Sequence, residues 1–477
     1  MRKVFKNCYE MDRRCYEEYG LTEDILMEHA AEGMESYIRH NLKDASSILI
    51  VAGPGNNGAD GIALARLMQF AFSDVKLYIP FGVRSAMAHK QLSRVEKLEY
   101  VEIVECVCES DIIVDALFGA GLSRPLEESA QDIVNSMNDL NGFKIACDIP
   151  TGIDESGRIS TVVFDADVTI TMGARKECHH TDAVKDVVGE IKRVDLGLRY
   201  NYYTKDIPVA SYLLDREDME LPSRDFSQVT HKGSFGHAVI FCGDKEGASI
   251  IAGMSASRFG AGLTTLISHE RITPPPYLMT GTEVPTNATA IAIGMGLGHY
   301  LGSEFLQKSV VESHLPVVLD ADSFYHEELL SILDQKEREI VLTPHPKEFT
   351  ALWKAITGES MTTDEVQENR FEMVRQFNAR YPHVTLLLKG ANMLIAQEDK
   401  LYINPFGSAK LSKGGSGDVL SGLIVAQLAQ GYTAIDAALQ GSLVLTAAAE
   451  QYSGASYAML PMDLIAEIER LEPQMKG

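Results

Sequence analysis

The chain has 477 residues, of which 67 are acidic and 43 are basic, and its formal net charge is −24. Its length exceeds the roughly 250–300 residues at which single cores stop growing, so two domains are expected. A surface this negative repels phosphate backbones and anionic lipids, which argues against nucleic acid or a membrane as the main partner. Small phosphorylated ligands remain possible, because backbone N–H groups bind phosphate whatever the global charge.

Cysteine usage and the N-terminus indicate a cytoplasmic protein. The seven cysteines include no CxxC pair, and their odd number fits reduced thiols better than a disulfide framework. Cys178-His179-His180 could suggest a metal site, but no second ligand pair lies at a useful spacing. The basic N-terminal segment lacks the apolar core of a signal peptide, and no run reaches the roughly 18 apolar residues of a membrane span.

In chain order, the first predicted element is a helix over residues 21–40, with Thr22 as its N-cap and apolar residues at helical spacing. A buried strand follows, then a glycine-rich loop and a second helix. Further short apolar runs come next, at 75–80, 111–121, 143–152 and 167–173. Runs buried on both faces and separated by helix-length segments predict a parallel sheet covered by helices on each side. The first half is therefore expected to be a Rossmann-like three-layer sandwich.

The α/β pattern restarts after a polar segment that runs from about Asp215 to Lys232. Apolar runs then recur at 237–244, 262–269, 290–298, 316–322, 338–345 and 384–390. Met393–Asn404 has the pattern of a hairpin, and a glycine loop near the end precedes an apolar helix predicted over Val419–Leu428. We place the domain boundary near Tyr212, which gives two α/β domains, 1–211 and 212–477.

The first glycine loop, Gly53-Pro54-Gly55-Asn56-Asn57-Gly58-Ala59-Asp60-Gly61, follows a buried strand and opens a helix. Free N–H groups at a helix N-terminus favour an anion, and glycines let the backbone approach a phosphate closely. A tight structural turn would produce the same GxGxxG pattern, so the loop by itself is weak evidence for a nucleotide site.

Polar residues end two later strands of the same sheet. Asp115 ends one apolar run, and Asp148, followed by Thr151, ends another. Ligands gather at the carboxyl ends of strands in open α/β sheets, so these groups and the asparagine pair of the glycine loop are expected on one rim. Oxygen ligands suit a hard cation, and a nearby carboxylate can move protons. A single aspartate here could also be a helix cap or a loop ion pair.

The motifs NNGADG, DALFGAG and DIPTGID, in this order, resemble the signatures of the YjeF N-terminal family of NAD(P)HX epimerases over roughly residues 1–211. The resemblance implies that potassium is bound by Asn57, Asp115 and Thr151, and that Asp148 contacts the nicotinamide-derived ring and acts in proton transfer. Ala59 departs from the family glycine, and Thr151 replaces the usual serine. The residues implied to hold the substrate are Asn56, Asn57, Gly58, Ala59, Asp60, Gly119, Ala120, Gly121, Leu122, Ser123, Arg124 and Pro125.

The second glycine loop, Lys413-Gly414-Gly415-Ser416-Gly417-Asp418, can direct several N–H groups at one point. An aspartate in the first turn of the following helix is placed to take a proton from a hydroxyl that attacks a phosphoryl group. A capped helix after a flexible loop is the simpler structural interpretation.

This loop resembles the GxGD element of the ribokinase-like superfamily, and the C-terminal domain resembles NAD(P)HX dehydratase. The resemblance to NAD(P)HX dehydratase also rests on the motifs HKGSFG, GDKEGA, GMGLG, LDAD, TPHP and LKG. The resemblance implies that Ala248, Gly298, His345 and Asp418 touch the hydrated nicotinamide nucleotide. It implies that Lys389, Gly390, Ala391, Asn392, Met393 and Gly417 bind the adenine nucleotide. Magnesium is the expected counter-ion, and Lys347 departs from a family glycine beside His345.

These resemblances predict a bifunctional enzyme that epimerises NAD(P)HX and dehydrates the S form to NAD(P)H, converting ADP to AMP and phosphate. Two alternatives remain: a small-molecule kinase in the second half, or a non-catalytic binding module in the first. The sequence does not separate ADP from ATP, or NADHX from NADPHX. Symmetric assemblies are common among such folds, so a homo-oligomer is expected.

Overall fold

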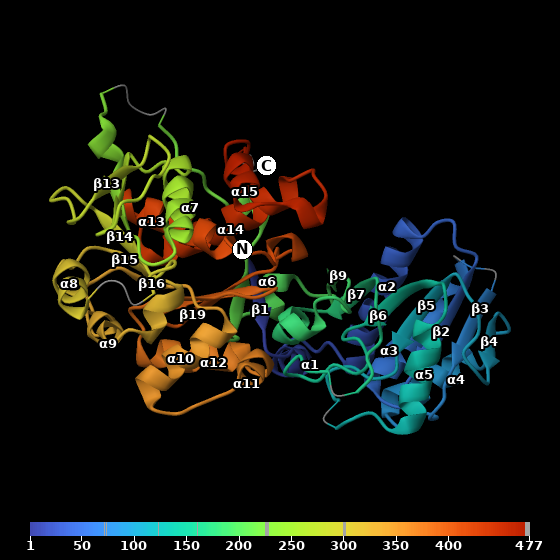
Figure 1. Cartoon of the computed structure of the whole chain (residues 1–477). Coiled ribbons are helices and arrows are strands. Elements are labelled where there is room, and N and C mark those ends of the chain that lie inside the picture. Colours follow the sequence, from blue (N-terminus) through green and yellow to red (C-terminus); the bar gives the residue numbers. More distant parts are fainter. Residues whose placement is uncertain are drawn as a thin grey trace. The chain divides into compact units, whose positions relative to one another are not determined.

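The computed structural model describes residues 1–70, 72, 74–122, 124–159, 161–224, 229–298 and 302–472. It divides into two compact units (Figure 1). We call Lys3–Ser211 the N-terminal unit, and Met1–Arg2 with Tyr212–Gly477 the C-terminal unit. Both are α/β structures, so the predicted fold class is confirmed. No helix in the described part of the chain has the length and apolar character needed to cross a bilayer.

The N-terminal unit is built on a parallel sheet of seven strands in the order β4-β3-β2-β5-β6-β7-β9. The strands are β2 (Ser47–Ala52), β3 (Asp74–Tyr78), β4 (Val101–Val104), β5 (Ile112–Ala116), β6 (Phe143–Cys147), β7 (Val168–Met172) and β9 (Glu190–Val194). The helices are α1 (Tyr9–Glu17), α2 (Glu23–Asn41), α3 (Asn56–Leu67), α4 (Ala86–Val95), α5 (Glu128–Asn138) and α6 (Tyr200–Tyr203). Outside this sheet, the short strands β1 (Arg2–Phe5) and β8 (Arg175–Lys176) pair with each other in parallel.

The central strand β2 shows why this unit has three layers. Ile48 and Ile50 pack in a core with α1 to α4, whereas Leu49 and Val51 pack in a second core with α5. Every residue of β2 after Ser47 is buried, because both faces of a parallel sheet are covered by helices. The three-layer prediction is confirmed.

The sheet of the C-terminal unit has the strand order β13-β12-β11-β14-β15-β16-β17-β18-β19-β10. The strands are β10 (Ser211–Leu213), β11 (His237–Phe241), β12 (Leu263–Ile267), β13 (Met279–Gly281), β14 (Ala290–Ile293), β15 (Val317–Leu319), β16 (Ile340–Leu342), β17 (Thr385–Leu388), β18 (Met393–Gln397) and β19 (Lys400–Asn404). Strands β18 and β19 pair antiparallel, which confirms the predicted hairpin. The strands from β13 to β17 are parallel.

Helices cover both faces of this second sheet (Figure 1). They are α7 (Glu246–Arg258), α8 (Ser303–Leu306), α9 (Glu328–Leu333), α10 (Pro346–Thr357), α11 (Thr363–Glu368), α12 (Arg370–Arg380), α13 (Ser416–Ala429), α14 (Ala434–Gln451) and α15 (Pro461–Ile468). Helix α13 is buried from Val419 to its end, because α7 and α14 pack against it. It begins three residues before the predicted Val419, since the glycine loop turns directly into helix and brings Asp418 into the first turn.

One further prediction about local structure is confirmed only in part, and several elements were not predicted. Thr22 is the N-cap residue of α2, but its side chain makes no capping hydrogen bond. Helix α1 and the short strands β4, β9, β10 and β13 were not predicted, because their sequences lack a continuous apolar run.

The turn from β2 into α3 requires a glycine at position 53. A Cβ atom at Gly53 would lie 1.7 Å from the carbonyl oxygen of Leu117, which belongs to the loop after the neighbouring strand β5. The Gly53 N–H donates to the Ala116 carbonyl at 2.9 Å, so the backbone cannot move away without losing this bond. The close approach therefore ties the glycine loop to the loop after β5.

We expect Gly53→Ala to destabilise the N-terminal unit by about 1–3 kcal/mol, the usual range for forcing extra atoms into a packed site. Gly55→Ala is the matched control, because nothing lies within 4 Å of its Cβ position. Differential scanning calorimetry of both variants measures the effect. Equal melting temperatures for the two variants would show that the Gly53 contact does not constrain the turn.

Candidate active sites

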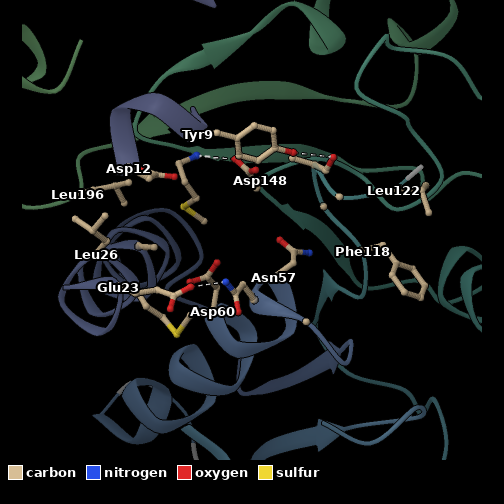
Figure 2. Close-up of a pocket in the computed structure, with 18 of the residues that line it drawn as sticks. Tyr9, Asp12, Glu23, Leu26, Asn57, Asp60, Phe118, Leu122, Asp148 and Leu196 are labelled. Carbon is tan, nitrogen blue, oxygen red and sulfur yellow. Dashed lines mark hydrogen bonds between the residues drawn. The ribbon is translucent and has the colours of Figure 1, made fainter. Parts of the chain in front are cut away.

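A cavity of about 660 Å³ opens at the carboxyl ends of the N-terminal unit's strands (Figure 2). Its walls come from α1, α2, the glycine loop and the loop after β5. Of the predicted site residues, those that line it are Asn56, Asn57, Asp60, Gly119, Ala120, Gly121, Leu122 and Asp148. The structure thus brings together residues from three separate motifs, as the sequence predicted.

Other predicted substrate residues lie elsewhere. Gly58 and Ala59 are buried inside α3, and the Ala59 methyl group packs in the core with the sheet. The departure from glycine is therefore accommodated by helical backbone. Arg124 and Pro125 are exposed after the loop, and Ser123 lies outside the described residues. Their roles in binding stay predictions.

The carboxylate of Asp148 is held through one of its two oxygens. Oδ1 accepts hydrogen bonds from the Lys176 ammonium at 2.6 Å, the Met172 N–H at 3.0 Å and the Thr171 hydroxyl at 3.2 Å. No hydrogen bond from the described residues reaches Oδ2. Burial by itself would raise the pKa of Asp148, but the Lys176 charge and these hydrogen bonds bring it below its usual value. Asp148 is therefore an ionised carboxylate with one oxygen available to a ligand.

Asp148 is positioned by two residues that the sequence analysis did not identify, Lys176 and His179. Lys176 is only 3% exposed, so Asp148 is the ionic partner of a buried ammonium. The ring Nε2 of His179 lies 2.9 Å from the Asp148 carbonyl oxygen. Burial lowers the pKa of His179 to about 4, so the ring is neutral and Nε2–H donates to the carbonyl. This bond holds Asp148 in its left-handed conformation, with φ of 65°.

Asp115 and Thr151, two of the three predicted potassium ligands, are in contact. The Thr151 N–H and hydroxyl each donate to the Asp115 carboxylate at 2.7 Å, and the Leu117 N–H donates to it at 3.1 Å. Asp115 is fully buried and has no cation beside it among the described residues, and burial raises its pKa to about 6. The third predicted ligand, Asn57, has a buried amide nitrogen without a hydrogen-bond partner.

In the C-terminal unit, Lys389 lies among acidic side chains that come from different elements. Its ammonium lies 2.8 Å from Asp320 Oδ1 and 3.7 Å from Glu348 Oε2. The Ser421 hydroxyl of α13 donates to Asp320 Oδ2 at 2.7 Å. The Cβ position of Gly417 is 3.4 Å from the Lys389 ammonium, so the glycine loop lies against this cluster. Asp320 and Glu348 were not predicted as site residues.

Asp418 stands at the start of α13 beside this cluster. Burial raises its pKa to about 6, with a further upward contribution from the Asp320 charge, and Lys389 partly opposes both. No hydrogen bond from the described residues reaches its carboxylate. A carboxyl group with these properties can act as a general base near neutral pH.

Arg370 supports the loop that contains the predicted nucleotide-binding residues 389–393. It is 4% exposed and donates to the backbone carbonyls of Lys389 at 3.0 Å and Asn392 at 2.8 Å. The Cβ position of Gly390 lies 2.4 Å from the guanidinium, so this glycine is required for the approach. Ala391 continues the loop and Met393 begins β18. Sequence reasoning had no signal for Arg370, which lies about twenty residues away along the chain.

The remaining predicted substrate residues have these positions. His345 caps α10: its Nδ1 accepts from the Glu348 N–H at 3.2 Å, and the Glu348 carboxylate accepts from the His345 N–H at 2.8 Å. Glu348 links His345 to Lys389, and the exposed Lys347 leaves this turn intact. Gly298 adopts φ of 59° with its N–H bonded to Asp322 at 2.9 Å. Ala248 is half-buried in α7.

These arrangements define the class of protein: an α/β enzyme with one aspartate-based site in each of two units. Comparisons with known proteins support that class. The NAD(P)H-hydrate dehydratase model matches residues 238–470, and the model of the YjeF-related protein N-terminus matches residues 23–178.

Relatives cover nearly the whole chain. The bifunctional NAD(P)H-hydrate repair enzyme Nnr of Helicobacter pylori is 38% identical over 99% of this chain and 100% of its own length. The enzyme of the same name from Escherichia coli is 31% identical, over 96% of this chain and 92% of its own. The ADP/ATP-dependent NAD(P)H-hydrate dehydratase from Bacillus subtilis, co-crystallised with ATP/Mg²⁺, is 27% identical with a TM-score of 0.47, over 55% of this chain and 97% of its own. The chain belongs to the family of bifunctional NAD(P)H-hydrate repair enzymes, which confirms the predicted resemblance.

We expect Lys176→Met to destabilise the N-terminal unit by about 3–5 kcal/mol at pH 7, because it leaves a buried carboxylate without its partner. The Asp148 pKa is depressed in the folded protein, so the pair stabilises at neutral pH and its contribution is lost as acid protonates Asp148. The loss should therefore shrink at acidic pH, and the double variant with Asp148→Asn should recover part of it. Calorimetry across this pH range, with the exposed Lys97→Met as control, measures both effects. A pH-independent loss would contradict the pairing.

Proposed function

We propose that this chain performs both steps of NAD(P)H-hydrate repair. The N-terminal unit interconverts the R and S forms of NAD(P)HX, and the C-terminal unit dehydrates the S form while ADP becomes AMP and phosphate. The proposal rests on a lysine–aspartate pair in each unit, with one buried member, beside a glycine-rich helix start. The seven cysteines are free thiols, which suits a reducing cytoplasm.

In the N-terminal unit, Asp148 is the group that exchanges protons with the substrate. Its Oδ2 is available and its pKa is low, so it can accept a proton at neutral pH. The loop Gly119–Leu122 and the start of α3 surround the same cavity and would hold the hydrated nucleotide there. Catalysis of epimerisation needs a bound substrate and a positioned proton acceptor, and both are provided by this arrangement.

In the C-terminal unit, Asp418 takes the proton of the C6 hydroxyl as that oxygen attacks the terminal phosphoryl group of ADP. The C6–O bond then breaks with its electron pair on the departing phosphate, while the lone pair of the ring nitrogen forms a double bond to C6. Loss of a C5 proton to water restores the reduced nicotinamide. The N–H groups of Gly414–Gly417 and the Lys389 ammonium would offset charge on the moving phosphoryl group. His345, Ala248 and Gly298 are proposed to contact the hydrated ring.

Magnesium fits the charge of this second site. The carboxylates of Asp320, Glu348 and Asp418 surround one lysine, so the site is negative before any phosphate enters. A divalent cation would neutralise phosphate charge when bound there together with the nucleotide. Residues 389–393 and Gly417 are proposed to bind the adenine nucleotide.

Potassium fits the cluster of Asp115, Thr151 and Asn57 in the first unit. Each of the three side chains has an oxygen that can act as a ligand, and Asp115 has no cationic partner among the described residues. Thr151 also accepts a hydrogen bond from the Phe118 N–H at 3.0 Å, and Phe118 lines the cavity. A cation here would neutralise Asp115 and fix the loop that faces the substrate.

A racemic substrate separates the two activities. With racemic hydrated NADH, ADP and Mg²⁺, the wild-type chain should convert all of the substrate. Asp148→Asn should stop near half, because a stereospecific second site consumes one epimer and the other reacts only at the uncatalysed rate. Asp418→Asn should form no NADH and retain nucleotide binding. Absorbance of the reduced nicotinamide and the yield of AMP are the readouts.

Three outcomes would overturn the proposal. Undiminished turnover in Asp418→Asn would remove its role as base. Phosphate retained on the product would indicate a small-molecule kinase, and complete conversion by Asp148→Asn at the wild-type rate would leave the first unit as a non-catalytic module.

Potassium binding should appear as stabilisation. At ten times its dissociation constant, potassium should raise the free energy of unfolding by about 1.4 kcal/mol. Asp115→Asn should lose this effect, whereas Asp132→Asn on the surface of α5 should keep it. Calorimetry in potassium against tetramethylammonium measures the shift. An equal response of Asp115→Asn and the wild type would place the ion elsewhere.

A further inference from the structure

Asp60 is a second carboxyl group in the cavity of the N-terminal unit. It projects from α3, and Figure 2 shows it across the cavity from Asp148, which follows β6. Its side chain receives no hydrogen bond or ion pair from the described residues. The two carboxyl groups therefore face the same cavity from different elements.

The groups around Asp60 are mostly acidic. Asp12, Arg13 and Tyr16 of α1 and Glu23 of α2 line the same cavity, and the Cys147 thiol of β6 is near enough to interact electrostatically with Asp60. Asp12 accepts a hydrogen bond from Tyr203 at 2.7 Å, and Glu23 accepts one from Asn56 at 2.5 Å. The carboxylates of Asp12 and Glu23 thus each accept a hydrogen bond from another side chain.

The one buried ammonium in the described part of this site, Lys176, is bonded to Asp148. Asp148 and Asp60 are therefore chemically unequal: Asp148 is in an ion pair, and Asp60 is in none with the described residues. Unequal environments of this kind divide two carboxyl groups into a base and an acid.

We infer that Asp60 is the general acid of the epimerisation and works opposite Asp148, the base, on a ring that opens and closes. The inference rests on the proposed function of the N-terminal unit and assigns the second proton position of that reaction. It gives Asp60 a catalytic role in addition to the predicted contact with substrate.

Opening and closure of the ring exchange one proton with each of the two carboxyl groups. Asp148 accepts the proton of the C6 hydroxyl, the C6–O bond becomes a carbonyl, and the C6–N1 bond breaks. The electron pair of that bond goes to N1, which takes the proton of Asp60. The open chain is an aldehyde, and rotation about its C5–C6 single bond presents the other face of the carbonyl. N1 then attacks that face, returns its proton to Asp60, and the oxygen recovers the proton of Asp148.

Electrostatics support this assignment. Burial raises the pKa of Asp60 well above its usual value, and the charges of Asp148, Asp12 and Glu23 raise it further. The pKa of Asp148 is lowered despite its burial, because of Lys176. Between these two pKa values Asp60 carries a proton and Asp148 does not, which is the arrangement that the first step requires.

Asp60→Asn in the full chain tests the inference, with racemic hydrated NADH and excess ADP. We expect kcat for epimerisation to fall by about 100-fold or more, since general acid catalysis contributes at least that much. Asp60→Glu should recover part of the rate. Conversion of the purified S epimer should be unchanged in both variants, which shows that the C-terminal unit is folded, and an unchanged calorimetric melting transition of the N-terminal unit shows the same for the unit that contains Asp60. Asp132→Asn on α5 is the matched carboxylate control.

The pH profile separates an acid from a structural contact. Wild-type epimerisation should decline as rising pH removes the Asp60 proton, and the residual rate of Asp60→Asn should lack this decline. A wild-type rate in Asp60→Asn, or an unchanged alkaline limb in that variant, would overturn the inference. Failure of the wild-type chain to epimerise at all would instead overturn the proposed function.

Discussion

Each unit of this protein pairs one lysine with an aspartate near the carboxyl ends of its parallel strands. Lys176 lies 2.6 Å from Asp148, and Lys389 lies 2.8 Å from Asp320. An ammonium or a carboxylate taken out of water costs several kcal/mol unless it is paired and hydrogen-bonded. The positions and pKa values of the neighbouring acidic groups depend on which carboxylate each of these two lysines contacts.

The two pairs have different consequences for catalysis. In the N-terminal unit the lysine binds Asp148 itself and lowers its pKa, whereas burial and the neighbouring acidic charges raise the pKa of Asp60. In the C-terminal unit the lysine binds Asp320, and Asp418 next to it has a pKa raised to about 6. A base with a pKa near the operating pH accepts a proton from a hydroxyl more effectively than an ordinary carboxylate does.

Backbone support is as important as charge in both sites. His179 holds the carbonyl of Asp148 in a left-handed conformation, and Arg370 binds two carbonyls of the loop 389–392. Gly53 and Gly390 allow approaches that a Cβ atom would block. Rigid support of this kind keeps acidic groups facing a ligand although their mutual repulsion would separate them.

The two α/β units, the parallel strands and the glycine-rich helix starts could be predicted from local patterns, because continuous apolar runs and glycine loops are local signals. The sequence also placed Asp148 and Asp418 at strand or helix ends, through motifs of a few residues. The cation that pairs with each carboxylate depends on long-range packing and could not be predicted in this way. Lys176 lies 28 residues from Asp148 and Lys389 lies 69 from Asp320, and no local pattern specifies such pairs. The protonation of Asp60 depends on the same long-range packing, because burial and distant charges set it.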